Sequence, residues 1–316
     1  MLHFLKLIRV QNLLIIVATQ CLIRWAVFEP MLKVNELQLQ FSNFHFFLLS
    51  LSVVLIAAGG YIINDYFDTK TDRVNHPEKV IIGKHISRTT ALYLHTSFNI
   101  VGVLIGIYIS WKVGMWKLVV IHLLSTGLLW FYSTAYKRQL LIGNVIVALL
   151  TALVPIQVAI YEILALNGQY ALYLQKMETN FLSFFYWSVG FGLFAFLGNM
   201  AREIVKDIED YEGDFASNCT TLPLTFGTKT AKWVAALFVV SIMVCSLFAY
   251  FLYIKEIISL VYISVTIVLP GIYIVYSLMK ADSQQDYHFT STLLKILMLF
   301  GLGYSLVFRF VVSNNL

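Results

Sequence analysis

Long apolar stretches alternate with short polar segments along the whole chain. Each stretch is about 20 residues long, the length that an α-helix needs to cross the hydrocarbon core of a bilayer. One such stretch could be a buried helix of a water-soluble protein, but nine in succession are typical of a membrane protein. The predicted spans cover residues 9–28, 43–63, 89–110, 115–134, 143–166, 181–201, 231–254, 257–279 and 290–312.

Three polar segments are longer than a simple turn, and they cover residues 64–88, 162–180 and 202–230. We expect them to be connections outside the apolar core of the membrane. None is long enough to form a separate water-soluble domain. The pattern therefore predicts an all-α polytopic membrane protein that forms a single domain over residues 1–316.

Composition supports the same class. Only 12% of the 316 residues are charged, about half of the share in an average soluble domain. The three cysteines and seven histidines show neither the CxxC nor the HExxH spacing of a zinc site. Because the chain is apolar and carries few charges, we expect membrane lipid rather than nucleic acid among its partners. Nothing in the sequence predicts an oligomeric state.

The distribution of lysine and arginine predicts the orientation. With the N-terminus in the cytoplasm, 15 of the 22 basic residues fall on the cytoplasmic side. Cytoplasmic loops of membrane proteins carry such an excess. We expect a multi-pass protein of the cytoplasmic membrane with its N-terminus inside and its C-terminus outside.

Two clusters of aspartates follow the second and the sixth predicted spans. The first cluster contains Asp65, Asp68 and Asp72, directly after Asn64. The second contains three aspartates at the same spacing, Asp207, Asp210 and Asp214. On a helix, residues at positions i, i+3 and i+7 lie on one face, so each set is expected to present three carboxylates together.

Each aspartate of the second cluster lies 142 positions after its counterpart in the first. This common offset predicts two related halves, about 1–142 and 143–316, that enclose a central cavity. Both clusters then lie at the cytoplasmic ends of spans. The mouth of the expected active site is therefore also cytoplasmic.

Like charges on one helical face repel each other, so these clusters indicate a ligand rather than a contribution to stability. Mg²⁺ prefers oxygen ligands and is commonly held by one or two carboxylates together with phosphate oxygens of a substrate. Basic residues that follow or precede the clusters can neutralise further phosphate charge. The candidates for this role are Arg73, Lys137, Arg202 and Lys206.

The segment 64–72, Asn-Asp-x-x-Asp-x-x-x-Asp, resembles the first signature of the UbiA superfamily of intramembrane prenyltransferases. Segment 9–12, Arg-Val-Gln-Asn, looks like the family's Arg-Pro-x-Asn motif with a valine in place of the proline. The segment from Tyr132 to Lys137 resembles the family's Tyr/Lys segment before the fifth helix. The nine spans and the second acidic motif extend the resemblance over nearly the whole chain.

The resemblance implies an Mg²⁺-dependent transfer of a prenyl group from an allylic diphosphate to a lipophilic acceptor, with release of diphosphate. The six aspartates would hold the metal ions, and Asn64 would orient the diphosphate or a metal-bound water. The four basic candidates would bind the diphosphate oxygens. Asn12, Tyr132 and Tyr136 are the further candidates for contact with substrate.

The identity of the acceptor rests on the second motif. Residues 202–214, followed by Thr-Leu-Pro at 221–223, are similar to the branch of the family that adds a geranylgeranyl chain to geranylgeranylglyceryl phosphate. Residues 79–84, Lys-Val-Ile-Ile-Gly-Lys, depart from the family's basic-Pro-x-Pro-Ser-Gly run. An aromatic acceptor of quinone or haem biosynthesis therefore stays open. A cation transporter is the alternative from another class.

Overall fold

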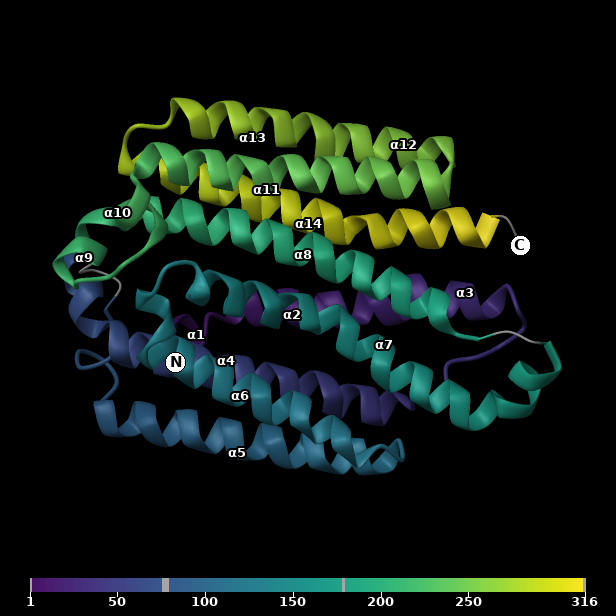
Figure 1. The fold of residues 1–316 in the computed structure, drawn as a ribbon. Coiled ribbons are helices and arrows are strands. Elements are labelled where there is room, and N and C mark those ends of the chain that lie inside the picture. Colours follow the sequence, from purple (N-terminus) through teal and green to yellow (C-terminus); the bar gives the residue numbers. More distant parts are fainter. Residues whose placement is uncertain (1, 76–79, 178–179, 315–316) are drawn as a thin grey trace.

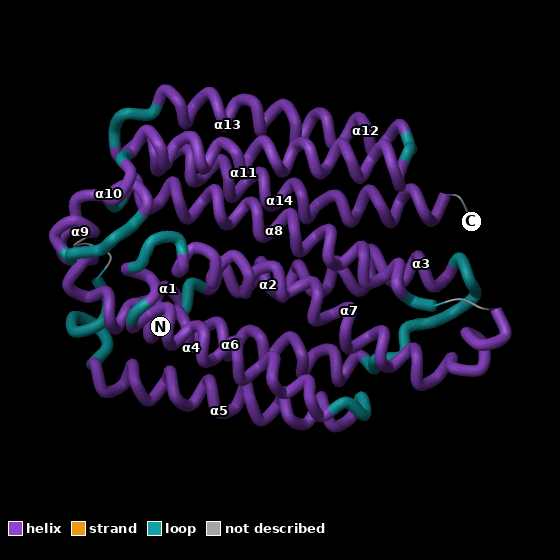
Figure 2. The backbone as a smooth tube through the Cα atoms, in the orientation of Figure 1, coloured by secondary structure: helices purple, strands orange, loops and turns teal. Residues whose placement is uncertain are grey.

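The computed structural model describes the chain apart from residues 1, 76–79, 178–179 and 315–316, and apart from the side chains of residues 70–75 and 176–177. Within this described part, nine helical segments are long and apolar enough to cross a membrane. The same part contains no β-strand, and short loops join the helices (Figure 2). The predicted all-α polytopic fold is confirmed.

The first half of the chain contributes these elements: α1 (Leu2–Leu7), α2 (Val10–Leu22), the π-helical turn η1 (Ile23–Phe28), α3 (Glu29–Lys33), α4 (Asn43–Asn75), α5 (Arg88–Lys112), the 3₁₀ turn η2 (Trp116–Leu118), α6 (Val119–Thr134) and the 3₁₀ turn η3 (Tyr136–Arg138). The second half contributes α7 (Ile142–Met177), α8 (Leu182–Glu209), α9 (Tyr211–Ala216), α10 (Leu222–Phe226), α11 (Thr228–Ala249), the π-helical turn η4 (Tyr250–Ile254), α12 (Ile257–Ile263), the π-helical turn η5 (Ser264–Val268), α13 (Leu269–Lys280) and α14 (Gln284–Asn314).

The long helices run side by side and form one bundle (Figure 1). Helix α4 packs against both α5 and α6, whereas α8 packs against α7, α11 and α14. Helix α2 contacts both groups, because it packs against α4, α7 and α14. The two termini lie near opposite ends of the bundle, and the short helices α9 and α10 lie at the end nearer the N-terminus (Figure 1).

Two helices extend further than the hydrophobic pattern predicts. Helix α4 continues through the first aspartate cluster to Asn75, and α7 continues to Met177 with a break in helical geometry at Tyr170. The expected loop over 162–180 is therefore wrong for most of its length. Residues 163–177 are rich in alanine, leucine and glutamine, which favour helix, and Leu166 is fully buried.

Two of the π-helical turns precede prolines. Pro30 follows η1, and Pro270 follows η5. Proline has no backbone N–H, and its ring clashes with the carbonyl group four residues earlier. A wider turn at that position relieves the clash, so each transmembrane segment continues past its proline.

A buried hydrogen-bond network joins four helices near the connection between α5 and α6. His122 of α6 lies 2.9 Å from the hydroxyl of Ser52 on α4 and 3.1 Å from the hydroxyl of Tyr161 on α7. Tyr161 is in turn 2.9 Å from Ser110 on α5. A Cβ atom at Gly106 would come within 2.5 Å of His122, so the glycine permits this close approach of α5. The network fixes three helices that line the cavity described below.

A buried ion pair lies at the end of the bundle away from α9. The side chains of Arg24 and Glu162 are almost fully buried, and their Nε and Oε2 atoms are 3.6 Å apart. Glu162 also accepts hydrogen bonds from the backbone N–H groups of Gln40 and Phe41, at 2.7 and 3.0 Å. This pair therefore attaches the segment before α4 to α7, and it does not contact the described residues of the aspartate motifs.

Candidate active site

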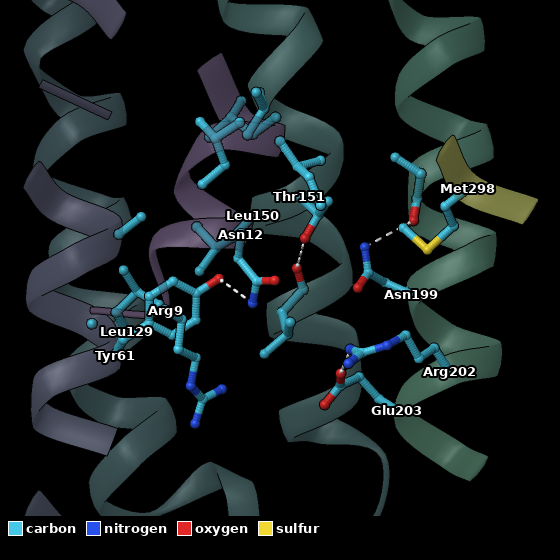
Figure 3. Close-up of a pocket in the computed structure, with 18 of the residues that line it drawn as sticks. Arg9, Asn12, Tyr61, Leu129, Leu150, Thr151, Asn199, Arg202, Glu203 and Met298 are labelled. Atoms are coloured by element: carbon cyan, nitrogen blue, oxygen red, sulfur yellow. Dashed lines mark hydrogen bonds and ion pairs between the residues drawn. The ribbon is translucent and has the colours of Figure 1, made fainter. Parts of the chain in front are cut away.

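A cavity of about 360 Å³ opens between α2, α4, α6, α7, α8 and α14. Its charged lining is concentrated near the end of the bundle that carries α9. Figure 3 shows Arg9, Asn12 and Tyr61 on one side of this polar region and Arg202 and Glu203 on the other. The central cavity expected between the helices is therefore present.

The inner part of the cavity is mostly apolar. Its walls come from aliphatic and aromatic residues of the same helices, namely Ile15, Ile16, Val53, Ile56, Leu129, Leu150, Val154, Phe191 and Phe194. Such a space excludes water and suits a hydrocarbon chain. The cavity thus combines a charged mouth with an apolar interior.

The first aspartate motif lies within the single continuous helix α4. The guanidinium group of Arg9 donates to Asp65 at 3.0 Å, and Lys137 forms an ion pair with Asp68. Arg9 adopts a left-handed backbone conformation between α1 and α2, which turns the chain at the point where it meets α4. The third aspartate, Asp72, and the candidate Arg73 have side chains outside the described residues.

The second aspartate motif is divided between two helices. Asp207 lies on α8 and accepts a hydrogen bond of 2.8 Å from Asn144 of α7. Helix α8 ends at Glu209 and α9 begins at Tyr211, so Asp210 lies at the junction. Our expectation that one continuous helix presents all three carboxylates is therefore wrong for this motif.

The helical break places Asp214 in the polar mouth. Helix α9 packs against α4, and Asp214 is buried and lines the cavity. Burial, together with the negative charge of Asp210, raises the pKa of Asp214 to about 6, and the nearby Lys137 acts in the opposite direction. The two motifs therefore meet at one mouth, with Lys137 close to both.

Most of the predicted site residues line this one cavity. They are Asn12, Asn64, Tyr132, Lys137, Arg202, Lys206, Asp207, Asp210 and Asp214. Asp65 and Asp68 are not part of the lining, but they form ion pairs with the lining residues Arg9 and Lys137. Tyr136 is not among the lining residues, and its ring lies 6.2 Å from that of Phe131.

Lys295 and Glu203 are not among the site residues predicted from the sequence, although both line the cavity, as does Asn144. Lys295 comes from α14 and donates a hydrogen bond of 3.4 Å to Asn12. Glu203 accepts a bond of 3.0 Å from Arg202. Lys295 could have been recognised from the sequence as a lysine isolated within an apolar span, because ionisable residues at membrane depth are usually functional.

The oxygen ligands at the mouth fit Mg²⁺ that binds together with a diphosphate. In the described part of the chain, no three acidic, histidine or cysteine side chains converge to form a complete metal site. Mg²⁺ commonly uses one or two protein carboxylates and takes its remaining ligands from water and phosphate. The buried Oδ1 atom of Asn64 accepts no hydrogen bond within the described residues, so it is an available oxygen ligand beside the carboxylates.

A charged mouth over an apolar interior, enclosed by membrane-spanning helices, defines an integral membrane enzyme for lipid-like phosphates. The chain belongs to the UbiA prenyltransferase family, which matches residues 36–300. It is therefore a prenyltransferase, an enzyme that transfers a prenyl group and releases diphosphate.

Similar proteins include the digeranylgeranylglyceryl phosphate synthase of Thermococcus kodakarensis, which is 34% identical over 79% of this chain and 80% of that protein. A solved structure of a digeranylgeranylglyceryl phosphate synthase superposes with a TM-score of 0.69 at 25% identity, covering 97% of both chains. A UbiA homologue from Archaeoglobus fulgidus, solved with DMAPP and Mg²⁺, has a TM-score of 0.54 at 16% identity and covers 96% of this chain and 99% of that one.

Proposed function

We propose that this enzyme transfers a geranylgeranyl group from geranylgeranyl diphosphate to geranylgeranylglyceryl phosphate, in an Mg²⁺-dependent reaction. The observation that carries the proposal is the meeting of both aspartate motifs at the mouth of one apolar cavity. The names of the similar proteins support the choice of acceptor and of prenyl group. In the reaction, the acceptor hydroxyl oxygen bonds to C1 of the prenyl group as the bond from C1 to the diphosphate breaks, and the hydroxyl proton is released.

The residues at the mouth bind and orient the diphosphate. The metal-binding set is Asp65, Asp68, Asp72, Asp207, Asp210 and Asp214, with Asn64 beside them. When bound, Mg²⁺ neutralises the developing negative charge of the leaving diphosphate. The second source of positive charge is the basic set, Arg73, Lys137, Arg202 and Lys206, which contacts the phosphate oxygens. Asn144 holds the Asp207 carboxylate in a fixed orientation.

The interior of the cavity holds the prenyl chain and keeps water from C1. The aromatic faces of Tyr61 and Tyr132, which line the cavity next to the mouth, stabilise positive charge that develops on the allylic carbon. The prenyl chain lies along the aliphatic walls deeper in the bundle. The substrates are lipids, and the enzyme therefore works within the bilayer, with its mouth and N-terminus on the cytoplasmic side.

The proposal also includes the internal organisation of the domain. Residues 1–142 and 143–316 form two related halves, and each half supplies one aspartate motif to the shared mouth. The identical spacing of the aspartates supports this relation.

Purified enzyme in lipid vesicles tests the proposed reaction. It receives labelled geranylgeranyl diphosphate and Mg²⁺, with geranylgeranylglyceryl phosphate and aromatic acceptors offered together. We expect label in digeranylgeranylglyceryl phosphate, and EDTA abolishes this product. Product on an aromatic acceptor alone contradicts the choice of acceptor, and product that persists in EDTA contradicts the role of Mg²⁺.

A further inference from the structure

Lys295 is an isolated positive charge on the cavity wall formed by α14. It lies about three turns into the helix, between apolar neighbours that include Leu294 and Ile296. Its ammonium group lines the cavity and donates a hydrogen bond of 3.4 Å to the side-chain oxygen of Asn12. No carboxylate of the described residues forms an ion pair with it. An ammonium group has three N–H donors, so it can donate to a further acceptor in the cavity.

A second cation of the cavity lining, Arg202, lies on α8, which packs against α14. One terminal nitrogen of Arg202 binds Glu203 at 3.0 Å, whereas its buried Nε–H has no hydrogen-bond acceptor within the described residues. An ionisable side chain at membrane depth is destabilised when it has no partner. The ammonium group of Lys295 and the Nε–H of Arg202 that Glu203 leaves unbonded therefore favour an anionic ligand.

This region lies deeper in the bundle than the carboxylates of the mouth. The side-chain amide N–H of Asn12, the partner of Lys295, donates a hydrogen bond of 3.4 Å to the hydroxyl of Tyr61. Tyr61 precedes Asp65 by four residues on α4, a rise of about 6 Å along the helix. Arg202 precedes Asp207 by five residues on α8, a rise of about 7.5 Å. Lys295 therefore lies at the depth expected for C1 of the donor. C1 is attached to the diphosphate and would lie on the side of it that is deeper in the cavity.

We propose that Lys295, supported by Asn12 and by the unbonded Nε–H of Arg202, binds the phosphate monoester of the acceptor, and that Arg202 lies between this phosphate and the donor diphosphate. The inference rests on the proposed function, because it requires an acceptor that carries a phosphate. In the glycerol phosphate acceptor, the carbon that bears the free hydroxyl is bonded directly to the carbon that carries the phosphate ester. A phosphate held at Lys295 therefore keeps the hydroxyl next to C1 of the donor. The carboxylates at the mouth repel this phosphate and retain the metal-bound diphosphate, so the two anions occupy separate positions.

The test compares two acceptors that differ only in the phosphate. Wild-type enzyme, Lys295→Met and Lys295→Arg receive saturating donor and either geranylgeranylglyceryl phosphate or geranylgeranylglycerol. The loss of one charge-assisted hydrogen bond predicts that Lys295→Met raises KM for the phosphorylated acceptor by about 10- to 100-fold. KM for the neutral alcohol and for the donor stays unchanged, and Lys295→Arg restores most of the loss. Lys280→Met, on the exposed end of α13, is the matched control and leaves all KM values unchanged.

Mg²⁺-dependent binding of donor to Lys295→Met shows that this variant is folded. An equal rise in KM for both acceptors, or a rise for the donor alone, overturns the assignment of Lys295. Wild-type enzyme that prenylates only aromatic acceptors overturns the proposed function and this inference together. Wild-type enzyme that makes the lipid product while Lys295→Met keeps its normal KM overturns the inference alone.

Discussion

The two aspartate motifs share one spacing but differ in local structure and in counter-charge. The first lies on the continuous helix α4, and its described aspartates, Asp65 and Asp68, form ion pairs with Arg9 and Lys137. The second is divided between α8 and α9, and Asp207 is held by the neutral amide of Asn144. Asp207 is therefore oriented by a neutral amide, whereas Asp65 and Asp68 are oriented by ion pairs. We infer that the Asp207 carboxylate depends more strongly on bound Mg²⁺ for its counter-charge.

The largest expected effect comes from removing one carboxylate charge from either motif. Asp68→Asn and Asp210→Asn should each lower kcat by about 1,000-fold or more, because each removes charge that holds the metal and the leaving diphosphate. Steady-state kinetics in vesicles measure this loss, and circular dichroism checks that both variants keep their helices. Normal turnover in either variant contradicts the assignment of that motif to the site.

Replacement of Lys137 tests the role of the positive charge that pairs with Asp68 in the first motif. Lys137→Met should lower kcat by about 100-fold, because it removes a positive charge beside the leaving diphosphate. Lys137→Arg keeps the charge and is expected to retain a larger share of the activity. Equal losses in the two variants would mean that the shape of lysine matters and its charge does not.

Replacement of Asn144 tests the role of the neutral amide that donates a hydrogen bond to Asp207 in the second motif. Asn144→Ala should raise the Mg²⁺ concentration needed for half-maximal activity by about 10-fold, because the Asp207 carboxylate loses the group that orients it. Titration of activity with Mg²⁺ measures the change. An unchanged Mg²⁺ requirement, together with reduced heat stability, would show that Asn144 only joins α7 to α8.

The smallest expected effect separates two tyrosines that lie four residues apart. Tyr132 lines the cavity and Tyr136 does not. Tyr132→Leu should lower kcat by about 5-fold through loss of an aromatic face near the allylic carbon, and Tyr136→Leu should leave kcat unchanged. Parallel assays of the two variants measure this difference. Equal effects in both would contradict the position given to Tyr132.

The sequence predicts the helical class and the nine spans, because a bilayer imposes a length and composition that can be counted directly. It predicts the residues of both motifs through the repeated spacing of their aspartates. It does not predict that α7 runs to Met177, since polar residues such as Gln169 are compatible with helix outside the hydrocarbon core. The break at Asp210 is hidden because the spacing of the aspartates is the same in both motifs. Lys295 is missed because the sequence alone does not show which face of the last span meets the cavity.

Binding of a non-reacting donor analogue tests the central claim, that the two motifs form a single Mg²⁺-dependent site. Calorimetry with the sulfur-bridged analogue of geranylgeranyl diphosphate is applied to wild-type enzyme, Asp68→Asn, Asp210→Asn and the double variant. If the motifs act as a unit, each single variant loses Mg²⁺-dependent binding, and the double variant binds no more weakly than either one. Independent, additive losses, or full Mg²⁺-dependent affinity in one single variant, would contradict a shared site.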